Sequence, residues 1–235
     1  MLTLLRKVFG LREPHPILRR NAQLFTDFNQ GRPLHEYCFT VFDTELTGLS
    51  RRKDQLISIG AVRVENLQII PGEQFHSLIR PDSIQPNSAT FIHRITPEQL
   101  EDAPPLEDVL PEFIEFCGNS LLVGHFVDLD MHFLNKAAEK ELGGSISNPS
   151  IDTMRLARRC QKAQNKDFYG GCDQSAACNL DALVEEFNLP KFKPHDALED
   201  ALQTAYLFLY LVKKFRQDGI ATLKELYGAG RQRGF

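Results

Sequence analysis

Phe39–Leu49 reads FTVFDTELTGL, and this stretch decides the fold. Its first four residues are aromatic or β-branched, which is typical of a buried β-strand. Asp43 ends this run, and Glu45 follows two residues later. Because residues two apart on a strand point to the same side, the two carboxylates should project together from the strand's end. Such a pair is costly to bury unless a cation lies between them, and oxygen ligands of this kind suit Mg²⁺ or Mn²⁺.

Around this stretch, the hydrophobic pattern predicts three strands in succession and then alternating helices and strands. The further strands are expected at residues 56–64, 69–70 with 74–80, 120–125 and 150–153. The helices are expected to start at Pro97 and to span residues 106–117, 128–142, 154–161, 180–187, 196–214 and 223–227. This order predicts an α/β fold with a mixed five-stranded sheet flanked by helices. The strand that carries Asp43 should be central, because it is the most continuously apolar.

The bulk composition is that of a globular protein, with 235 residues, 42% of them hydrophobic and 25% charged. Five cysteines without the spacing of a disulfide framework indicate a reducing compartment, so we expect a cytoplasmic protein. No apolar run is long enough to span a bilayer, and the N-terminus is a poor signal peptide, so no membrane partner is expected. The net charge of −4 does not exclude a phosphate-rich substrate, since two divalent ions in an acidic site would neutralise it.

Three regions are expected along the chain. Residues 1–35 carry six Lys and Arg against two acids and are interpreted as a basic N-terminal appendage. This appendage either packs on the domain, binds a partner or is a partly disordered leader. Residues 36–216 form the main domain, and residues 217–235 form a last helix turn with a mobile tail.

Two later stretches share the character of the first. Asp130 lies near the start of a helix that follows a buried strand, where the helix dipole favours a carboxylate. Asp200 lies in the second turn of the helix predicted from residue 196, among alanines, and has no evident structural role. Asp196 and Glu199 instead fit an N-cap and its capping-box partner. His195 directly precedes this helix.

Together, the three stretches resemble the three motifs of the DEDDh family of 3′→5′ exonucleases, whose fold is RNase H-like. Residues 43–49 resemble the family's Asp-Thr-Glu-Thr-Thr-Gly-Leu, residues 124–130 its Gly-His-Asn-x-x-Phe-Asp, and residues 195–200 its His-x-Ala-x-x-Asp. The resemblance covers about residues 36–216 in family order, which makes 36–216 the exonuclease domain. It is closest to the proofreading (epsilon) subunit of bacterial DNA polymerase III. A chance match of three ordered motifs is improbable.

The resemblance implies that Asp43, Glu45, Asp130 and Asp200 hold two divalent cations, Mg²⁺ or Mn²⁺, with His195 as the general base. Two ions about 4 Å apart can serve both the attacking and the leaving oxygen of a phosphodiester. An imidazole titrates near neutrality and can take the proton of the attacking water.

The resemblance also implies a set of substrate contacts, namely Thr44, Thr47, Gly48, Leu49 and His125. The glycine would let the backbone approach the terminal nucleotide, and the leucine would wedge against a base. His125 would either line this cleft or support it structurally. The chain departs from the family at Phe126, where an Asn is usual, and at Leu46, where a Thr is usual, and both differences bear on how the strand is held.

We therefore expect a metal-dependent 3′→5′ exonuclease that acts on the single-stranded or frayed 3′ end of DNA. It would release nucleoside 5′-monophosphates in proofreading or repair, with a DNA polymerase subunit as a partner. Two alternatives stay open. One is an RNA-trimming exoribonuclease of the same fold, and the other is a non-catalytic subunit that binds nucleic acid or a polymerase. The complete set of acids and His195 argues against the second alternative.

Overall fold

A five-stranded mixed sheet forms the centre of the molecule. The structure, a computed structural model, describes residues 13–83, 94–164 and 178–230. The strands are β1 (Phe39–Leu46), β2 (Leu56–Glu65), β3 (Gln68–Leu78), β4 (Leu121–Gly124) and β5 (Ser150–Asp152). Their order is β3-β2-β1-β4-β5, with β1, β2 and β3 antiparallel in succession and β1, β4 and β5 parallel. The predicted mixed sheet, with the strand of Asp43 at its centre, is confirmed.

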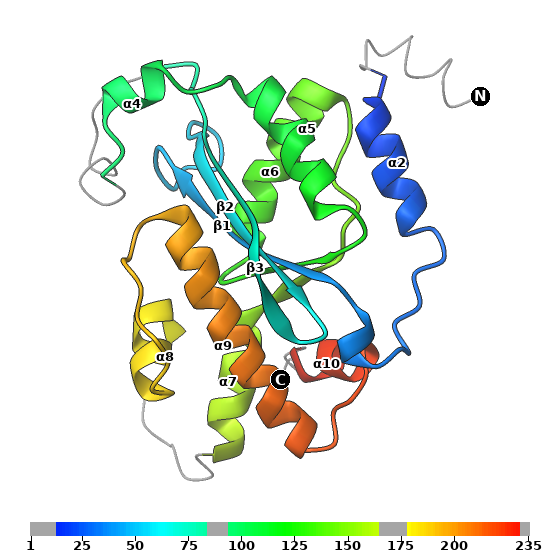
Figure 1. Cartoon of the computed structure of the whole chain (residues 1–235). Helices are drawn as coiled ribbons and strands as arrows, with labels where there is room; N and C mark the ends of the chain where they lie inside the picture. The colour runs from blue at the N-terminus through cyan, green and yellow to red at the C-terminus, as the bar shows by residue number, and fades with distance from the viewer. Residues whose placement is uncertain (1–12, 84–93, 165–177, 231–235) are drawn as a thin grey trace.

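Helices cover both faces of this sheet (Figure 1). One face packs against α7 (Thr153–Gln164), α8 (Leu180–Glu186), α9 (Ala197–Gln217) and α10 (Leu223–Gly230). The other packs against α2 (Pro16–Leu24), α5 (Leu106–Cys117) and α6 (Asp128–Leu142). Phe39 and Val41 of β1 lie in the first core and Phe42 in the second, as the alternation of a strand requires. The α/β class is therefore a three-layer arrangement.

Local capping signals set several helix ends where the sequence predicts them. Thr96 and Gln99 form a reciprocal capping box at the start of α4 (Pro97–Glu101). Gly143, at φ +74°, ends α6 in the left-handed region that glycine adopts readily. The bounds of α5 and α6 agree with the predicted ones.

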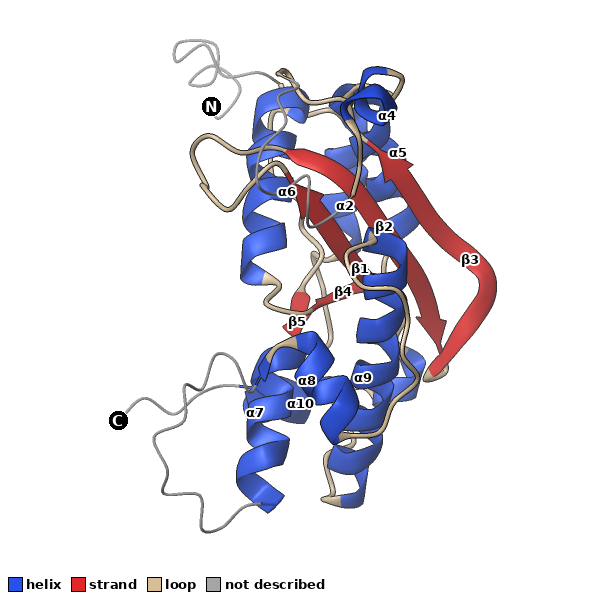
Figure 2. Cartoon of the chain, turned by 90° about the vertical axis from the view of Figure 1, so that its left-hand side faces the viewer, coloured by secondary structure: helices blue, strands red, loops and turns tan. Residues whose placement is uncertain are grey.

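The prediction of an interrupted third strand was wrong, because β3 runs without a break past Pro71 and Gly72. β3 is the edge strand of the sheet, as Figure 2 shows, and Pro71 lies in the stretch between Ile69 and Gln74 that has no ladder partners, so a residue without an N–H donor is tolerated there. A register shift between Val62 and Val64 of β2 absorbs the irregularity.

The described part of the N-terminal segment packs on the domain. Ile17 and Leu18 of α2 are buried in the core of α5 and α6. Nearer the sheet, a 3-10 helix (Leu34–Glu36) begins where the N–H of Leu34 donates to the carbonyl of Ala221 at 2.9 Å. Residues 1–12 and 231–235, which include parts of the predicted appendage and tail, lie outside the described residues, and the division at 35/36 and 216/217 stays a prediction. Within the described ranges, no helix has both the length and the apolar character needed to cross a bilayer.

Candidate active site

Three carboxylates meet where β1 ends beneath the first turns of α9. Asp43 and Glu45 lie on the face of β1 that α9 covers, as their spacing predicts. Asp200 comes from α9. Each of these three side chains offers a carboxylate oxygen, and the three oxygens lie within 4.8 Å of one another. The structure thus brings residues 43, 45 and 200 to one place.

Asp130 reaches the same region from the other face of the sheet. β1 and β4 are parallel, so their carboxyl ends lie at one edge, and α6 starts four residues beyond the end of β4. Asp130 is buried in the first turn of α6 and accepts a hydrogen bond from the hydroxyl of Thr44. Its charge raises the pKa of Asp43, after the larger effect of burial itself. All four predicted metal ligands therefore interact electrostatically.

The four carboxyl groups are costly to ionise together. Burial, with smaller contributions from the neighbouring acids, raises the pKa of Asp43 well above its usual range and that of Glu45 to about 7. Burial also raises the pKa of Asp130 to about 7 and that of Asp200 to about 6. A divalent cation would offset both the desolvation and the mutual repulsion, and an all-oxygen donor set fits such a hard ion. The residues present can therefore hold a divalent metal.

Gly60 lets α9 come close enough to form this site. It pairs with Asp43 across β1 and β2. A Cβ at Gly60 would lie 2.2 Å from backbone atoms of both Ala197 and Leu198, so the first turn of α9 rests on the backbone of β2. Gly60 has no role among the sequence predictions, although a glycine inside an apolar strand is a recognised signal of close backbone approach.

His195 lies beside Asp200 just before α9. Its backbone adopts φ +63°, and its N–H donates to Oδ2 of Asp200 at 2.8 Å. This bond opposes the effect of burial by lowering the pKa of Asp200. The side chain is exposed, and its imidazole has no hydrogen-bond partner in the described part of the chain. The backbone of His195 thus fixes a carboxylate while its ring is free to reach a water.

The predicted substrate contacts of the first motif fall into two groups. Leu49 is 77% exposed and free to touch a ligand. Thr44 and Thr47 use their hydroxyls within the protein, to Asp130 and to Asp54 respectively. Gly48 also contacts Asp54, since a Cβ there would lie 2.7 Å from its Oδ2. Leu49 is the best placed of the four, and the substrate roles of all four stay predictions.

His125 is held by hydrogen bonds at both ring nitrogens. Nδ1 pairs with the Thr153 hydroxyl at 2.9 Å and Nε2 with the Cys178 carbonyl at 2.8 Å. Burial lowers the pKa of His125 to about 4, so the ring is neutral at pH 7. Of the two roles expected for His125, this arrangement favours structural support, because neither ring nitrogen is free for a substrate.

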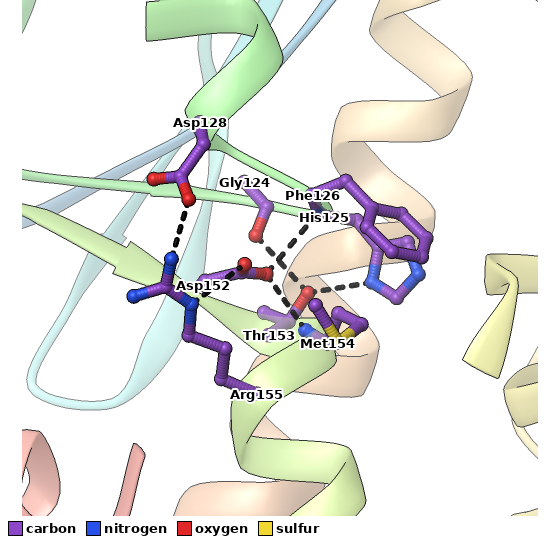
Figure 3. Close-up of polar contacts among 8 residues, drawn as sticks. All are labelled: Gly124, His125, Phe126, Asp128, Asp152, Thr153, Met154 and Arg155. Carbon is purple, nitrogen blue, oxygen red and sulfur yellow. Dashed lines mark hydrogen bonds and ion pairs between the residues drawn. The ribbon is translucent and has the colours of Figure 1, made fainter. Parts of the chain in front are cut away.

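Asp152 organises the turn that leads into α6 (Figure 3). Its Oδ1 accepts the backbone N–H groups of Phe126, at 3.1 Å, and Met154, at 2.9 Å. Arg155 bridges Asp152 and Asp128. These bonds hold Phe126 at φ +56°, a backbone conformation that a bulky residue rarely adopts. The sequence pattern does not reveal this role, because the donors to Asp152 lie on two segments, the turn before α6 and the start of α7.

The chain is similar in sequence and in fold to known proteins. A family model described as Exonuclease, RNase T, matches residues 40–208. The DNA polymerase III subunit epsilon of Aquifex aeolicus is 35% identical over 176 residues, which are 75% of this chain and 81% of that protein. A PolC-type DNA polymerase III of Thermotoga petrophila is 36% identical over 188 residues, which cover 80% of this chain but 13% of the polymerase.

Among solved structures, exonuclease X in complex with 5′ overhanging duplex DNA superposes with a TM-score of 0.58 at 25% identity. The match covers 82% of this chain and 99% of exonuclease X. The predicted resemblance to epsilon and the RNase H-like fold are confirmed by these similarities. Because the family model and the epsilon relative both span most of this chain, the chain belongs to the RNase T family of exonucleases.

Proposed function

We propose that this protein is a metal-dependent 3′→5′ exonuclease that acts on the 3′ end of DNA and releases nucleoside 5′-monophosphates. The observation that carries the proposal is the convergence of Asp43, Glu45 and Asp200 within 4.8 Å, with Asp130 behind them and the free ring of His195 alongside. The likeness to an epsilon subunit, and to an exonuclease solved with duplex DNA, favours DNA as the substrate. It also makes a DNA polymerase subunit the partner that we propose.

The acidic residues would hold two divalent cations, Mg²⁺ or Mn²⁺. Bound there, the ions would lower the pKa of the attacking water and stabilise the leaving 3′-oxygen. The charges of the other three acids, Glu45, Asp130 and Asp200, each raise the pKa of Asp43. This shared interaction makes Asp43 the best candidate to contact both ions. Thr44 fixes the Asp130 carboxylate by its hydrogen bond.

His195 would act as the general base, taking the proton of the attacking water at its imidazole. Its backbone N–H donates to Asp200, so His195 would both supply the base and position one metal ligand. Leu49, exposed three residues beyond the end of β1, would contact the terminal base and hold the last nucleotide over the acids.

The test follows hydrolysis of oligonucleotides labelled at the 5′ end. Single-stranded DNA, single-stranded RNA and a DNA duplex with a 3′ mismatch are each incubated with Mg²⁺, with Mn²⁺ and with chelator. We expect a metal-dependent ladder that shortens from the 3′ end on DNA, with nucleoside 5′-monophosphates as products.

Asp43→Asn should abolish the ladder, because it removes the ligand proposed to contact both ions. Glu112→Gln, an exposed acid on the outer side of α5, is the matched control and should retain full activity. Faster hydrolysis of RNA than of DNA would show that RNA, and not DNA, is the preferred substrate. The absence of a ladder on every substrate, with folded protein and either metal, would overturn the proposal in favour of a binding subunit.

A further inference from the structure

A basic loop leaves the active site directly after the exposed Leu49. It connects β1 to β2, and Arg51, Arg52 and Lys53 at its tip are all exposed. In the described part of the chain, none of these three cations forms an ion pair. None of the three positive charges is therefore neutralised by a salt bridge, although the chain as a whole carries a net charge of −4.

The loop's own acid is turned inward. Asp54 accepts the Thr47 hydroxyl at 2.9 Å with Oδ1 and the Ser50 N–H at 2.7 Å with Oδ2. Its carboxylate thus closes the turn rather than neutralising the tip. The turn is also closed by the N–H of Thr47, which donates to the Gln55 carbonyl at 3.0 Å.

Lys136 of α6 anchors the same loop from beneath. Its ammonium donates to the carbonyl oxygens of Arg51, Arg52 and Asp54 at 3.0, 3.2 and 3.3 Å. Nζ thereby uses its three donors on three backbone carbonyls, which fixes the path of the loop. Lys136 also adds a fourth positive charge that no carboxylate pairs with in the described structure. The side chains at the tip consequently extend from an ordered backbone.

The exposed cations and the neighbouring Leu49 fit a single-stranded nucleic acid, which carries both phosphates and bases. Grouped cations that form no salt bridges repel one another and attract anions, and the exposed Leu49 beside them offers an apolar contact. Proteins that bind single-stranded nucleic acid combine a positively charged groove for the phosphates with side chains that contact the bases, most often aromatic ones, and Leu49 offers an aliphatic contact in their place. A positive loop would also offset the repulsion between a phosphate backbone and the four carboxylates nearby.

We propose that Arg51, Arg52 and Lys53 bind the phosphate backbone of the nucleic acid whose 3′ end occupies the acidic site, and that Lys136 is the positioning residue that keeps the loop in place. The inference rests on the proposed function for the identity of the ligand. It adds a contact outside the metal site and assigns it to a segment that the three motifs do not include.

The experiment measures binding separately from hydrolysis. A 5′-fluorescein-labelled single strand with phosphorothioate linkages at its 3′ end is titrated with the full chain, and anisotropy is followed at several NaCl concentrations. Each phosphate contact on a single strand contributes about 0.7 to the slope of log K against log salt. Replacing Arg51, Arg52 and Lys53 together by Ala should therefore reduce the magnitude of the slope by about 2. The same change should lower the binding constant by about 100-fold near 0.1 M salt.

The matched control removes the same charge elsewhere. The three replacements, Lys213→Ala, Arg216→Ala and Lys224→Ala, lie at the far end of α9 and on α10. At 1.5 Å per residue, the two on α9 are roughly 20 to 24 Å along the helix from Asp200. This control should leave the slope unchanged. Arg51→Lys with Arg52→Lys, which keeps the charges, should retain the wild-type slope. Melting curves of all the variants check that they are folded.

An unchanged slope in the folded loop variant would overturn the inference, as would an equal loss in the control, which would mark a general charge effect. Failure of the proposed function looks different. In that case the wild-type protein would not shorten any oligonucleotide with either metal, whatever the loop does to binding.

Discussion

Asp43→Asn should stabilise the metal-free protein at pH 8 while it abolishes hydrolysis. In the wild-type protein, four carboxylates must ionise together in a partly buried site, which burial and mutual repulsion oppose. Asparagine keeps the shape of the side chain and removes one charge. The remaining three acids then repel one another less.

The sign of the pH dependence follows from the raised pKa values. Between the pKa in the unfolded chain, about 4 for an acid, and the raised value in the folded protein, the folded state binds more protons than the unfolded state. Stability therefore falls as pH rises through this window, which ends near 7 for Glu45 and Asp130 and near 6 for Asp200. Below about pH 4 the groups are protonated in both states and the penalty is absent.

One pKa unit corresponds to about 1.4 kcal/mol, so a relief of about 1.5 units, summed over the three remaining acids, gives roughly 2 kcal/mol at pH 8. For a chain of this size, that corresponds to a rise in Tm of about 4 to 8 °C.

Melting in chelator from pH 5 to pH 8 measures the effect. The wild-type Tm should fall across this range, the Asp43→Asn variant should fall less, and Glu112→Gln should follow the wild type. Addition of Mn²⁺ should raise the Tm of the wild type far more than that of Asp43→Asn. A variant less stable than the wild type in chelator at pH 8 would mean that Asp43 is a structural residue and would refute the reasoning.

Three further changes test separate parts of the site. Gly60→Ala should destabilise the fold by about 1–3 kcal/mol or more and lower hydrolysis, because the new methyl displaces α9 and with it Asp200; denaturant melts and rates on single-stranded DNA check this. His195→Asn, which suits the left-handed backbone there, should lower kcat by about 10²- to 10⁴-fold yet keep the metal-dependent rise in Tm, and an unchanged kcat would remove His195 as the base. Lys136→Met should speed amide hydrogen exchange across residues 47–55 and weaken DNA binding, whereas unchanged exchange would show that the lysine does not order the loop.

Local patterns in the sequence predict the elements well because local bonds decide their ends. The capping box of Thr96 and Gln99 and the left-handed Gly143 act within a few residues of the helices they terminate. β3 was mispredicted because a proline's effect depends on whether its strand lies at the edge of the sheet, which is a property of the assembled sheet. The bounds of β3 therefore depend on its position in the sheet, which its own residues do not reveal.

The candidate site divides in the same way. The shared side of Asp43 and Glu45 follows from the period of one strand, so it was predictable. Thr44 is expected to contact substrate, and His125 either to line the cleft or to support it. In the structure they bond to Asp130 and Cys178, more than fifty residues away in the sequence. No spacing rule connects such pairs, so their use inside the protein becomes visible only in the folded structure.

The distance between α9 and the sheet joins the core to the proposed chemistry. The helix presents Ala197, Ala201 and Ala205 to the interior, all almost fully buried, and β2 opposes its first turn with Gly60. Small residues on both sides allow a contact that larger side chains would prevent, and this contact brings Asp200 to the acids of β1. Because dense interiors transmit a change of one methyl group, a substitution in this contact should disturb metal binding without touching a ligand. The residues that pack α9 on the sheet are therefore also those that set the spacing of the carboxylates.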